Sequence, residues 1–253
     1  MPKKSGTNTG KGRFYRKLVE RAGERSFQVV VGQSDLWITV AASAPETLEE
    51  TALQRVTELR GQIHAWMILD PEFGESLVPV AARPGAPEVI RRMCSASRIM
   101  GVGPMACVAG AVAGCTAETL LPWSSECIVE NGGDIMLHSS KERVVAMLSE
   151  TEGGTRIGLR LQKEDFPVSV CASSSFIGHS LSLGRGELAV VRSPDPFLAD
   201  AAATAFCNML KSAEDASKVA EQAALYADAG VEGVFLQCGG NIGIWGRMEL
   251  TGL

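Results

Sequence analysis

Short runs of alternating apolar and polar residues follow the amino-terminal segment. Residues 13–19 (RFYRKLV), 26–32 (SFQVVVG) and 35–42 (DLWITVAA) show the period of two that is typical of half-buried strands, with turn-forming residues between them. We therefore expect an antiparallel meander of three strands at the start of the fold.

The apolar period lengthens to three or four residues after this meander. Ser43 and Glu46 have the spacing of a helix-capping box. The apolar positions that follow would form one helical stripe: Leu48, Ala52, Val56, Leu59, Ile63 and Trp66. We expect a helix over 43–69 with this stripe against a core, and two more helices over 86–101 and 104–121.

Strand patterns return in the second half of the chain and alternate with helical ones. Strands are expected over 126–131, 134–139, 143–149, 156–161, 167–173 and 187–193. Two helices over 196–212 and 213–230 follow, and then two strands over 231–237 and 241–250. Blocks of strands separated by blocks of helices indicate an α+β fold of antiparallel strands with packed helices.

A strand, a glycine pair and a second strand occur twice, each time after helices. The first copy reads IVENGGDIML over 128–137, and the second reads FLQCGGNIGI over 235–244. This repetition favours an internal duplication with two pseudo-equivalent lobes, each carrying one glycine hairpin.

Composition and charge narrow the function classes. The 253 residues are 45% hydrophobic and carry a net charge of -5, which suits a single folded domain over 13–253 and argues against a nucleic-acid partner. Residues 1–12 are basic and polar, so we expect a disordered tail. No secretory leader is expected, because FYRKLVERAGERSF follows the tail in place of an apolar stretch. No membrane span is expected either, because glycine and proline interrupt the most apolar stretch, so we predict a cytoplasmic protein. Seven cysteines without a C-x-x-C pair indicate free core thiols.

The first glycine pair has two interpretations. Asn131-Gly132 is a favoured turn sequence, and glycines tolerate the positive φ of a tight hairpin. Alternatively, Gly132 and Gly133 let a phosphate or a flat heterocycle approach the backbone, and Asp134 binds a hydroxyl, an amide or a metal-bound water.

A carboxylate and a hydroxyl lie four residues apart in the helical pattern over 196–212. Asp200 and Thr204 would project from one helical face, and both are hard oxygen donors of the kind that Mg²⁺ accepts. The alternative is structural: Asp200 near the start of the helix is stabilised by the helix dipole, and Thr204 packs among alanines.

The segment CASSSFIGHSLSLGRGE, residues 171–187, places three serines and a histidine after a strand. His179 could act as a general base or contact a phosphate, and Ser173, Ser174 and Ser175 could donate hydrogen bonds to a ligand. A solvent-exposed polar loop is the alternative.

Gly110 and Gly114 lie one turn apart among alanines, where they favour the close approach of another helix.

Together, GGDI, the serine run before a histidine and ADAAATA resemble the ApbE-like superfamily, whose best-known members are Mg²⁺-dependent FAD:protein FMN transferases. The stretches FYRKLV, GPMACVAGAVA, GHSLSLG and GGNIGIWG look like its leaderless branch that was once linked by name to thiamine biosynthesis. This closer resemblance covers residues 13–250.

The resemblance implies a T-fold-type α+β architecture with a flavin nucleotide bound between two lobes. It implies that Asp200 and Thr204 hold the magnesium together with a backbone carbonyl from within residues 106–109. By the same resemblance Gly132, Gly133 and Asp134 contact the nucleotide, which is FAD or another nucleotide, and Asp134 and His179 take part in catalysis. An acceptor protein would be the second partner.

Two departures from the transferase pattern keep other functions open. Ser182 and Leu183 stand where a His-x-x-Asp-Pro loop would end, and Ala109 stands where a lysine precedes a glycine. The site could therefore serve as a non-catalytic binding module for a small anionic metabolite. A sulfur-assimilation enzyme that forms homocysteine is a third hypothesis, implied by the branch's association with that chemistry. A homodimer is also expected, because exposed strand edges can pair with a second copy of the chain.

Overall fold

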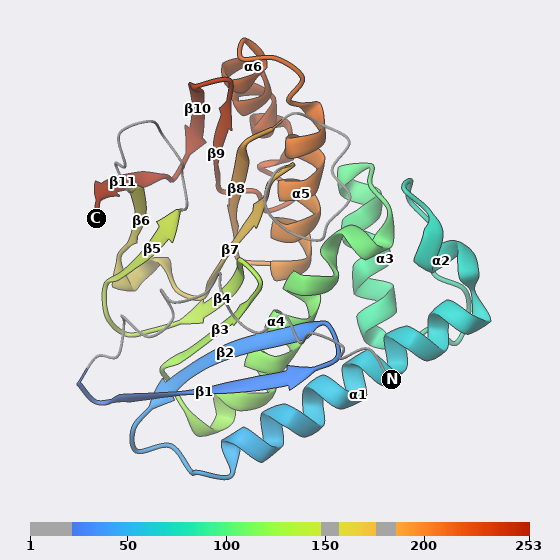
Figure 1. The fold of residues 1–253 in the computed structure, drawn as a ribbon, viewed down its shortest axis with the longest axis vertical. Coiled ribbons are helices and arrows are strands. Elements are labelled where there is room, and N and C mark those ends of the chain that lie inside the picture. Colours follow the sequence, from blue (N-terminus) through green and yellow to red (C-terminus); the bar gives the residue numbers. More distant parts are fainter. Residues whose placement is uncertain (1–21, 148–156, 176–185) are drawn as a thin grey trace, which may run out of the picture.

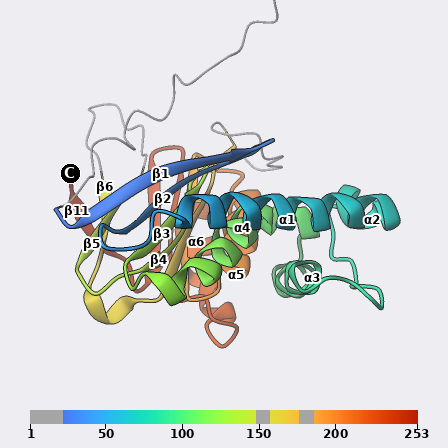
Figure 2. The ribbon, with the colours of Figure 1, turned by 90° about the horizontal axis from the view of Figure 1, so that it is seen from below.

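The computed structural model describes residues 22–147, 157–175 and 186–253. Within these residues the strands form an eight-stranded antiparallel sheet with the order β1-β2-β3-β4-β7-β8-β9-β10 and a three-stranded sheet with the order β11-β6-β5. The helices cover one face of the large sheet and the small sheet covers the other (Figures 1 and 2). The predicted α+β class is confirmed.

The large sheet is assembled from four consecutive hairpins. Its strands are β1 (Glu24–Val31), β2 (Ser34–Ala41), β3 (Cys127–Asn131), β4 (Asp134–His138), β7 (Val168–Ser173), β8 (Leu188–Ser193), β9 (Gly233–Cys238) and β10 (Asn241–Gly246). The small sheet contains β5 (Arg143–Met147), β6 (Ile157–Leu161) and β11 (Glu249–Gly252). One continuous sheet thus joins the two expected halves, with β4 paired to β7 at its centre.

Helices lie between the hairpins in both halves. They are α1 (Leu48–Leu69), α2 (Pro71–Glu75), α3 (Glu88–Met100), α4 (Val108–Leu120), α5 (Pro196–Met209) and α6 (Asp215–Gln222), with short 3₁₀ segments η2 (Pro104–Cys107), η3 (Leu121–Trp123), η4 (Lys163–Asp165) and η5 (Ala223–Tyr226). Each half therefore runs from a hairpin through helices to a second hairpin. The internal duplication that this order suggests remains a prediction.

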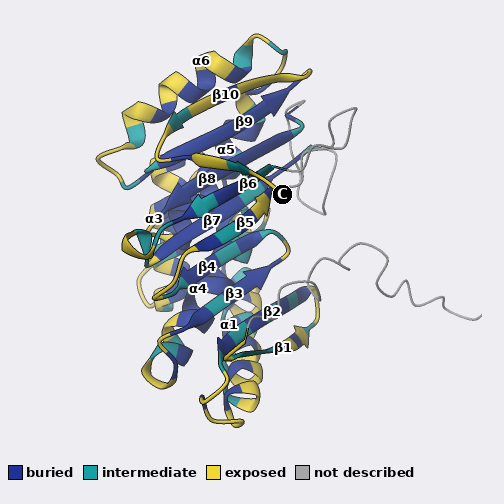
Figure 3. Ribbon diagram, turned by 90° about the vertical axis from the view of Figure 1, so that its left-hand side faces the viewer, coloured by how far each residue is buried: buried dark blue, intermediate teal, exposed yellow. Residues whose placement is uncertain are grey.

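The sheet has a core on each face, because successive side chains along a strand point to opposite faces. Met136 of β4 and Cys171 of β7 belong to the core under the helices, whereas Leu137 and Val170 belong to the core under the small sheet. Figure 3 shows the central strands buried and the surfaces of α6 and β10 exposed. The site described below lies on the helix side of β4 and β7.

Several boundaries differ from those the sequence predicts. Helix α1 begins at Leu48, and its N-cap residue Thr47 makes no side-chain cap hydrogen bond, so the predicted capping box of Ser43 and Glu46 is wrong. The predicted strand over 241–250 is two strands in two sheets, because Gly246 turns the chain with a φ of 74°. The predicted strand over 13–19 and the tail over 1–12 lie outside the described residues.

Residues Pro104–Trp123 form the one described helical stretch that is long and apolar enough to cross a membrane, and 61% of its apolar window is buried inside the protein. Its α4 part packs against α1, α5 and β3. Core packing therefore accounts for its composition.

Candidate functional site

The site is built on a close crossing of α4 and α5. A Cβ atom added to Gly110 would lie 2.3 Å from the carbonyl oxygen of Pro196 and 2.8 Å from Cβ of Asp200, and one added to Gly114 would lie 2.3 Å from Cγ of Pro196. The prediction that Gly110 and Gly114 allow close helix packing is confirmed. The crossing brings Asp200 to the first turn of α4, where the Gly110 backbone N–H donates to Asp200 Oδ2 at 2.8 Å.

Thr204 lies one turn further along α5 and is half-buried. Its Oγ1 lies 3.3 Å from the carbonyl oxygen of Ala106, to which it can donate a hydrogen bond. The carbonyl of Ala109 instead accepts from Nδ2 of Asn131 at 3.1 Å. The resemblance implied a metal-binding carbonyl from within residues 106–109. The carbonyl of Ala106 is the one that faces Thr204. Asp200 is the fifth residue of α5, so the alternative that places it in a first helical turn is wrong.

The glycine pair forms the tight turn between β3 and β4. Asn131 pairs with Asp134 across the turn, and Gly132 and Gly133 have φ angles of 72° and 115°. The Gly133 N–H donates to Oε1 of Glu130 at 3.2 Å, and a Cβ on Gly133 would have no neighbour within 4 Å. The hairpin interpretation is confirmed, and the contact of Gly132, Gly133 and Asp134 with a nucleotide stays a prediction.

Asp134 points from the start of β4 toward the helices and is only 6% exposed. Ile135 pairs with Val170, which brings Asp134 beside the next residue of β7, Cys171. The Cys171 thiol and the Ala172 N–H both donate to the Asp134 carboxylate. Its Oδ1 atom is buried and has no hydrogen-bond partner among the described residues.

The two buried carboxylates act on each other electrostatically. Burial raises the pKa of Asp200 well above its ordinary value, and the charge of Asp134 raises this pKa further, against the opposing hydrogen bonds from Gly110 and Ala109. Burial likewise raises the pKa of Asp134. Neither carboxylate forms an ion pair within the described part of the chain. The site therefore holds two neighbouring carboxyl groups whose ionised forms no cationic side chain described here stabilises.

The serine run lies at the same end of the sheet, where β7 ends and β4 begins. Ser173 and Ser174 at the end of β7 are buried, and Ser175 is half-buried. The Ser175 N–H donates to the carbonyl of Gly186 at 3.0 Å, and its hydroxyl lies 3.8 Å from the sulfur of Cys207. His179 lies outside the described residues, so its role as a base or phosphate contact stays a prediction.

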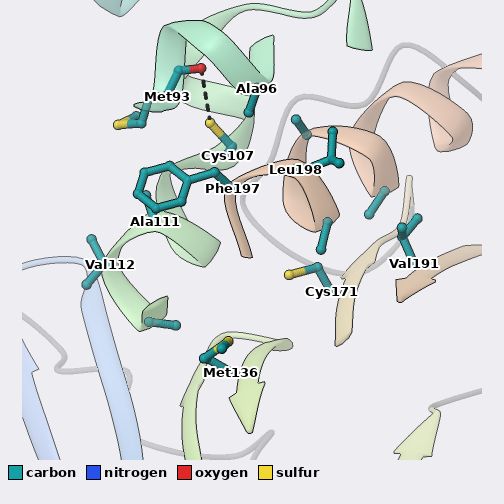
Figure 4. Close-up of a cluster of buried hydrophobic side chains, with 14 of the residues drawn as sticks. Met93, Ala96, Cys107, Ala111, Val112, Met136, Cys171, Val191, Phe197 and Leu198 are labelled. Carbon is teal, nitrogen blue, oxygen red and sulfur yellow. Dashed lines mark hydrogen bonds between the residues drawn. The ribbon is translucent and has the colours of Figure 1, made fainter. Parts of the chain in front are cut away.

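Two thiols lie near the carboxylates. No motif in the sequence pointed to them. Cys107 and Cys171 project into the core around Phe197 and Leu198 (Figure 4). Burial raises the pKa of both thiols; the charge of Asp200 raises that of Cys107 further, and the charge of Asp134 raises that of Cys171 further. The alternation along β7 could have revealed Cys171, which lies two residues before Ser173 on the same face. Within the described residues no group of three His, Cys, Asp or Glu side chains converges on a metal position.

A family profile with the description AbpE bacteria matches residues 16–243. The chain belongs to this family. Among its relatives, the UPF0280 protein of Methanosarcina acetivorans is 34% identical over 212 residues, covering 83% of each chain. That of Methanopyrus kandleri is 36% identical over 205 residues, covering 80% of this chain and 81% of its own. Membership of the ApbE-like superfamily is confirmed, in the branch that contains the UPF0280 proteins.

Solved structures share the fold at low sequence identity. The flavin transferase ApbE from Vibrio cholerae aligns with a TM-score of 0.61 and 10% identity over 88% of this chain and 96% of its own. The flavinyl transferase ApbE of Pseudomonas stutzeri in its apo form aligns with a TM-score of 0.57 and 11% identity over 88% of this chain and 93% of its own. This AbpE-family chain therefore has the ApbE fold, which the resemblance predicted.

Proposed function

We propose that this AbpE-family protein binds a flavin dinucleotide with a divalent metal and transfers FMN from it to a hydroxyl group of an acceptor protein. Three oxygen donors support the proposal: Asp200 and Thr204 lie four residues apart on α5, and the Thr204 hydroxyl lies 3.3 Å from the Ala106 carbonyl oxygen. The shared fold with flavin transferases supports the substrate class.

The residues at the site fit a hard divalent cation. Carboxylate, hydroxyl and carbonyl oxygens are the donors that Mg²⁺ and Mn²⁺ prefer, with water and phosphate completing six positions. Adjacent oxygen ligands of an octahedral Mg²⁺ lie about 3 Å apart. The 3.3 Å between Thr204 Oγ1 and the Ala106 carbonyl oxygen is close to that spacing. The unpartnered, buried Oδ1 of Asp134 further marks the site as one that needs a cation or a proton.

In the proposed reaction, the acceptor hydroxyl attacks the phosphorus atom of the FMN half of FAD. A P–O bond to that phosphorus forms, the pyrophosphate P–O bond breaks, AMP leaves, and the hydroxyl proton passes to a base. A bound Mg²⁺ would offset the negative charge of the pyrophosphate. The Gly110 N–H holds the Asp200 carboxylate in place, and Gly133, whose Cβ position has no neighbour within 4 Å, leaves room at the hairpin tip for a phosphate or the flavin ring. We assign to His179 the role of the base that accepts this proton.

The test is to incubate the purified protein with FAD and Mg²⁺, alone and with Ser- and Thr-containing acceptor peptides. Chromatography would detect AMP, and in-gel fluorescence would detect covalent flavin. We expect both products from the wild type, neither from Asp200→Asn, and normal amounts from the control Asp215→Asn, whose carboxylate accepts from the N–H groups of Lys211 and Ser212 just before α6. Absence of AMP and of bound flavin in every sample would contradict the transferase proposal.

The sequence departures favour a second candidate, a binding module that holds the nucleotide without cleaving it. Ala109 supplies no cation where transferases have a lysine, and Ser182 and Leu183 replace the Asp-Pro pair. Calorimetry with FAD, FMN and AMP, with and without Mg²⁺, separates the two candidates. Tight FAD binding without AMP release would favour the module. The cytoplasmic location, the homodimer and the acceptor protein remain predictions from the sequence.

A further inference from the structure

Asp134 and Asp200 come from different elements and meet on the helix side of the sheet. Asp134 is the first residue of β4, and Asp200 lies on α5, which packs against β4 and β7. The side chains are 6% and 7% exposed. The Cys171 sulfur, beside Asp134, lies 3.9 Å from the Pro196 carbonyl oxygen, and this oxygen and Cβ of Asp200 both lie against Gly110. The two carboxylates are therefore neighbours around one buried position.

The hydrogen bonds of the two carboxylates are unequal. Asp200 accepts the Gly110 N–H through Oδ2 at 2.8 Å. Asp134 accepts from Cys171 and Ala172, yet its buried Oδ1 has no hydrogen-bond partner among the residues that the structure describes. A buried carboxylate oxygen without a donor is unfavourable, and a second carboxylate beside it makes ionisation more unfavourable still. Some positive group must complete this position.

A proton and a metal ion are the two candidates, and the surroundings favour the metal ion. A shared proton would need only the two carboxylates, whereas Thr204 lies one turn from Asp200 on α5, with its hydroxyl 3.3 Å from the Ala106 carbonyl oxygen. Four hard oxygen donors suit a divalent cation. Thr204, Ala106 and Ala109 are partly exposed, so this side of the site borders solvent.

We propose that Asp134 is a direct ligand of the cation held by Asp200 and Thr204, so that this chain binds a divalent metal ion through two carboxylates before any nucleotide is present. The inference rests on the proposed function only for the metal site at Asp200 and Thr204. It changes the expected role of Asp134 from a nucleotide contact to a metal ligand. A two-carboxylate site also leaves the cation with less net positive charge to attract the pyrophosphate, so nucleotide binding would depend more on the hairpin backbone.

The test is a Mn²⁺ titration followed by electron paramagnetic resonance of the free ion, with no nucleotide present. Four proteins are compared: the wild type, Asp134→Asn, Asp200→Asn and the control Asp215→Asn. We expect one Mn²⁺ per wild-type chain and an affinity lower by roughly tenfold or more in both site variants. The control variant should bind like the wild type.

A stability measurement separates lost ligation from misfolding. In urea without metal, Asp134→Asn should be at least as stable as the wild type, because the amide removes one of two neighbouring charges. At one Mn²⁺ concentration, the ion should then raise the urea midpoint of the wild type by more than that of Asp134→Asn. Equal Mn²⁺ affinity in the wild type and Asp134→Asn, with loss in Asp200→Asn, would overturn this inference and leave the proposed function standing. Absence of Mn²⁺ binding by the wild type without nucleotide would overturn this inference, and the assay with FAD and Mg²⁺ would still decide the proposed function.

Discussion

Replacing Gly110 by alanine tests whether the α4–α5 crossing holds the site together. In an open helix position this change stabilises a protein by about 0.5–1 kcal/mol. At Gly110 the new Cβ would lie 2.3 Å from the Pro196 carbonyl oxygen, a backbone atom that cannot rotate away. The helices must separate, which costs about 1–3 kcal/mol for overpacking and about 1.5–3 kcal/mol if the hydrogen bond to Asp200 breaks. We expect a net loss of roughly 2–4 kcal/mol in the free energy of unfolding.

Urea unfolding, followed by circular dichroism, measures this loss. Gly61→Ala is the matched control, because Gly61 is an exposed residue within α1 and a Cβ there meets nothing within 4 Å. The control should be slightly more stable than the wild type, and Gly110→Ala should be clearly less stable and bind Mn²⁺ more weakly. Equal or greater stability of Gly110→Ala would refute the close crossing.

Three further predictions concern other parts of the fold. Burial alone raises the pKa of Glu126, but hydrogen bonds from Ser140, Ser139 and Arg143 outweigh it and lower the pKa to about 2. The stability this group contributes should thus be complete above about pH 4.5 and be lost as the pH falls toward 2, by at most about 3 kcal/mol in urea unfolding at stepped pH. Native protein should react slowly with a thiol reagent and unfolded protein rapidly at all seven cysteines, since all seven are buried; fast native labelling would contradict this. Gly243→Ala should destabilise the protein by about 1–3 kcal/mol, because its Cβ would lie 2.0 Å from the Ala216 carbonyl, whereas Gly252→Ala, which meets nothing within 4 Å, should be neutral in the same unfolding assay.

Much of the fold could be predicted from local patterns. The apolar stripe from Leu48 to Trp66 is buried on α1 as its period indicates, and the alternation of β3, β4, β7 and β8 places them in an antiparallel sheet. Asp200 and Thr204 could be paired from their spacing, because four residues along a helix return to the same face. The spacing of Gly110 and Gly114 likewise predicted a close helix neighbour.

Other features depend on contacts between distant segments, which no local pattern encodes. The separation of β10 from β11 follows from the turn at Gly246, whose backbone packs against Glu232 and Gly233. The choice of the Ala106 carbonyl depends on how α5 crosses η2. The proximity of Asp134, Cys171 and Asp200 arises from the β4–β7 pairing together with helix packing. Each of these requires tertiary geometry.

The metal position itself offers the most direct measurement. Crystals of the protein soaked in Mn²⁺ would locate the ion by its anomalous scattering. The account predicts one peak about 2.2 Å from the oxygens of Asp200, Thr204 and Ala106, with Asp134 as a further ligand. No peak there at saturating Mn²⁺, or a peak only at another acidic cluster such as the one around Asp165 and Glu232, would contradict it.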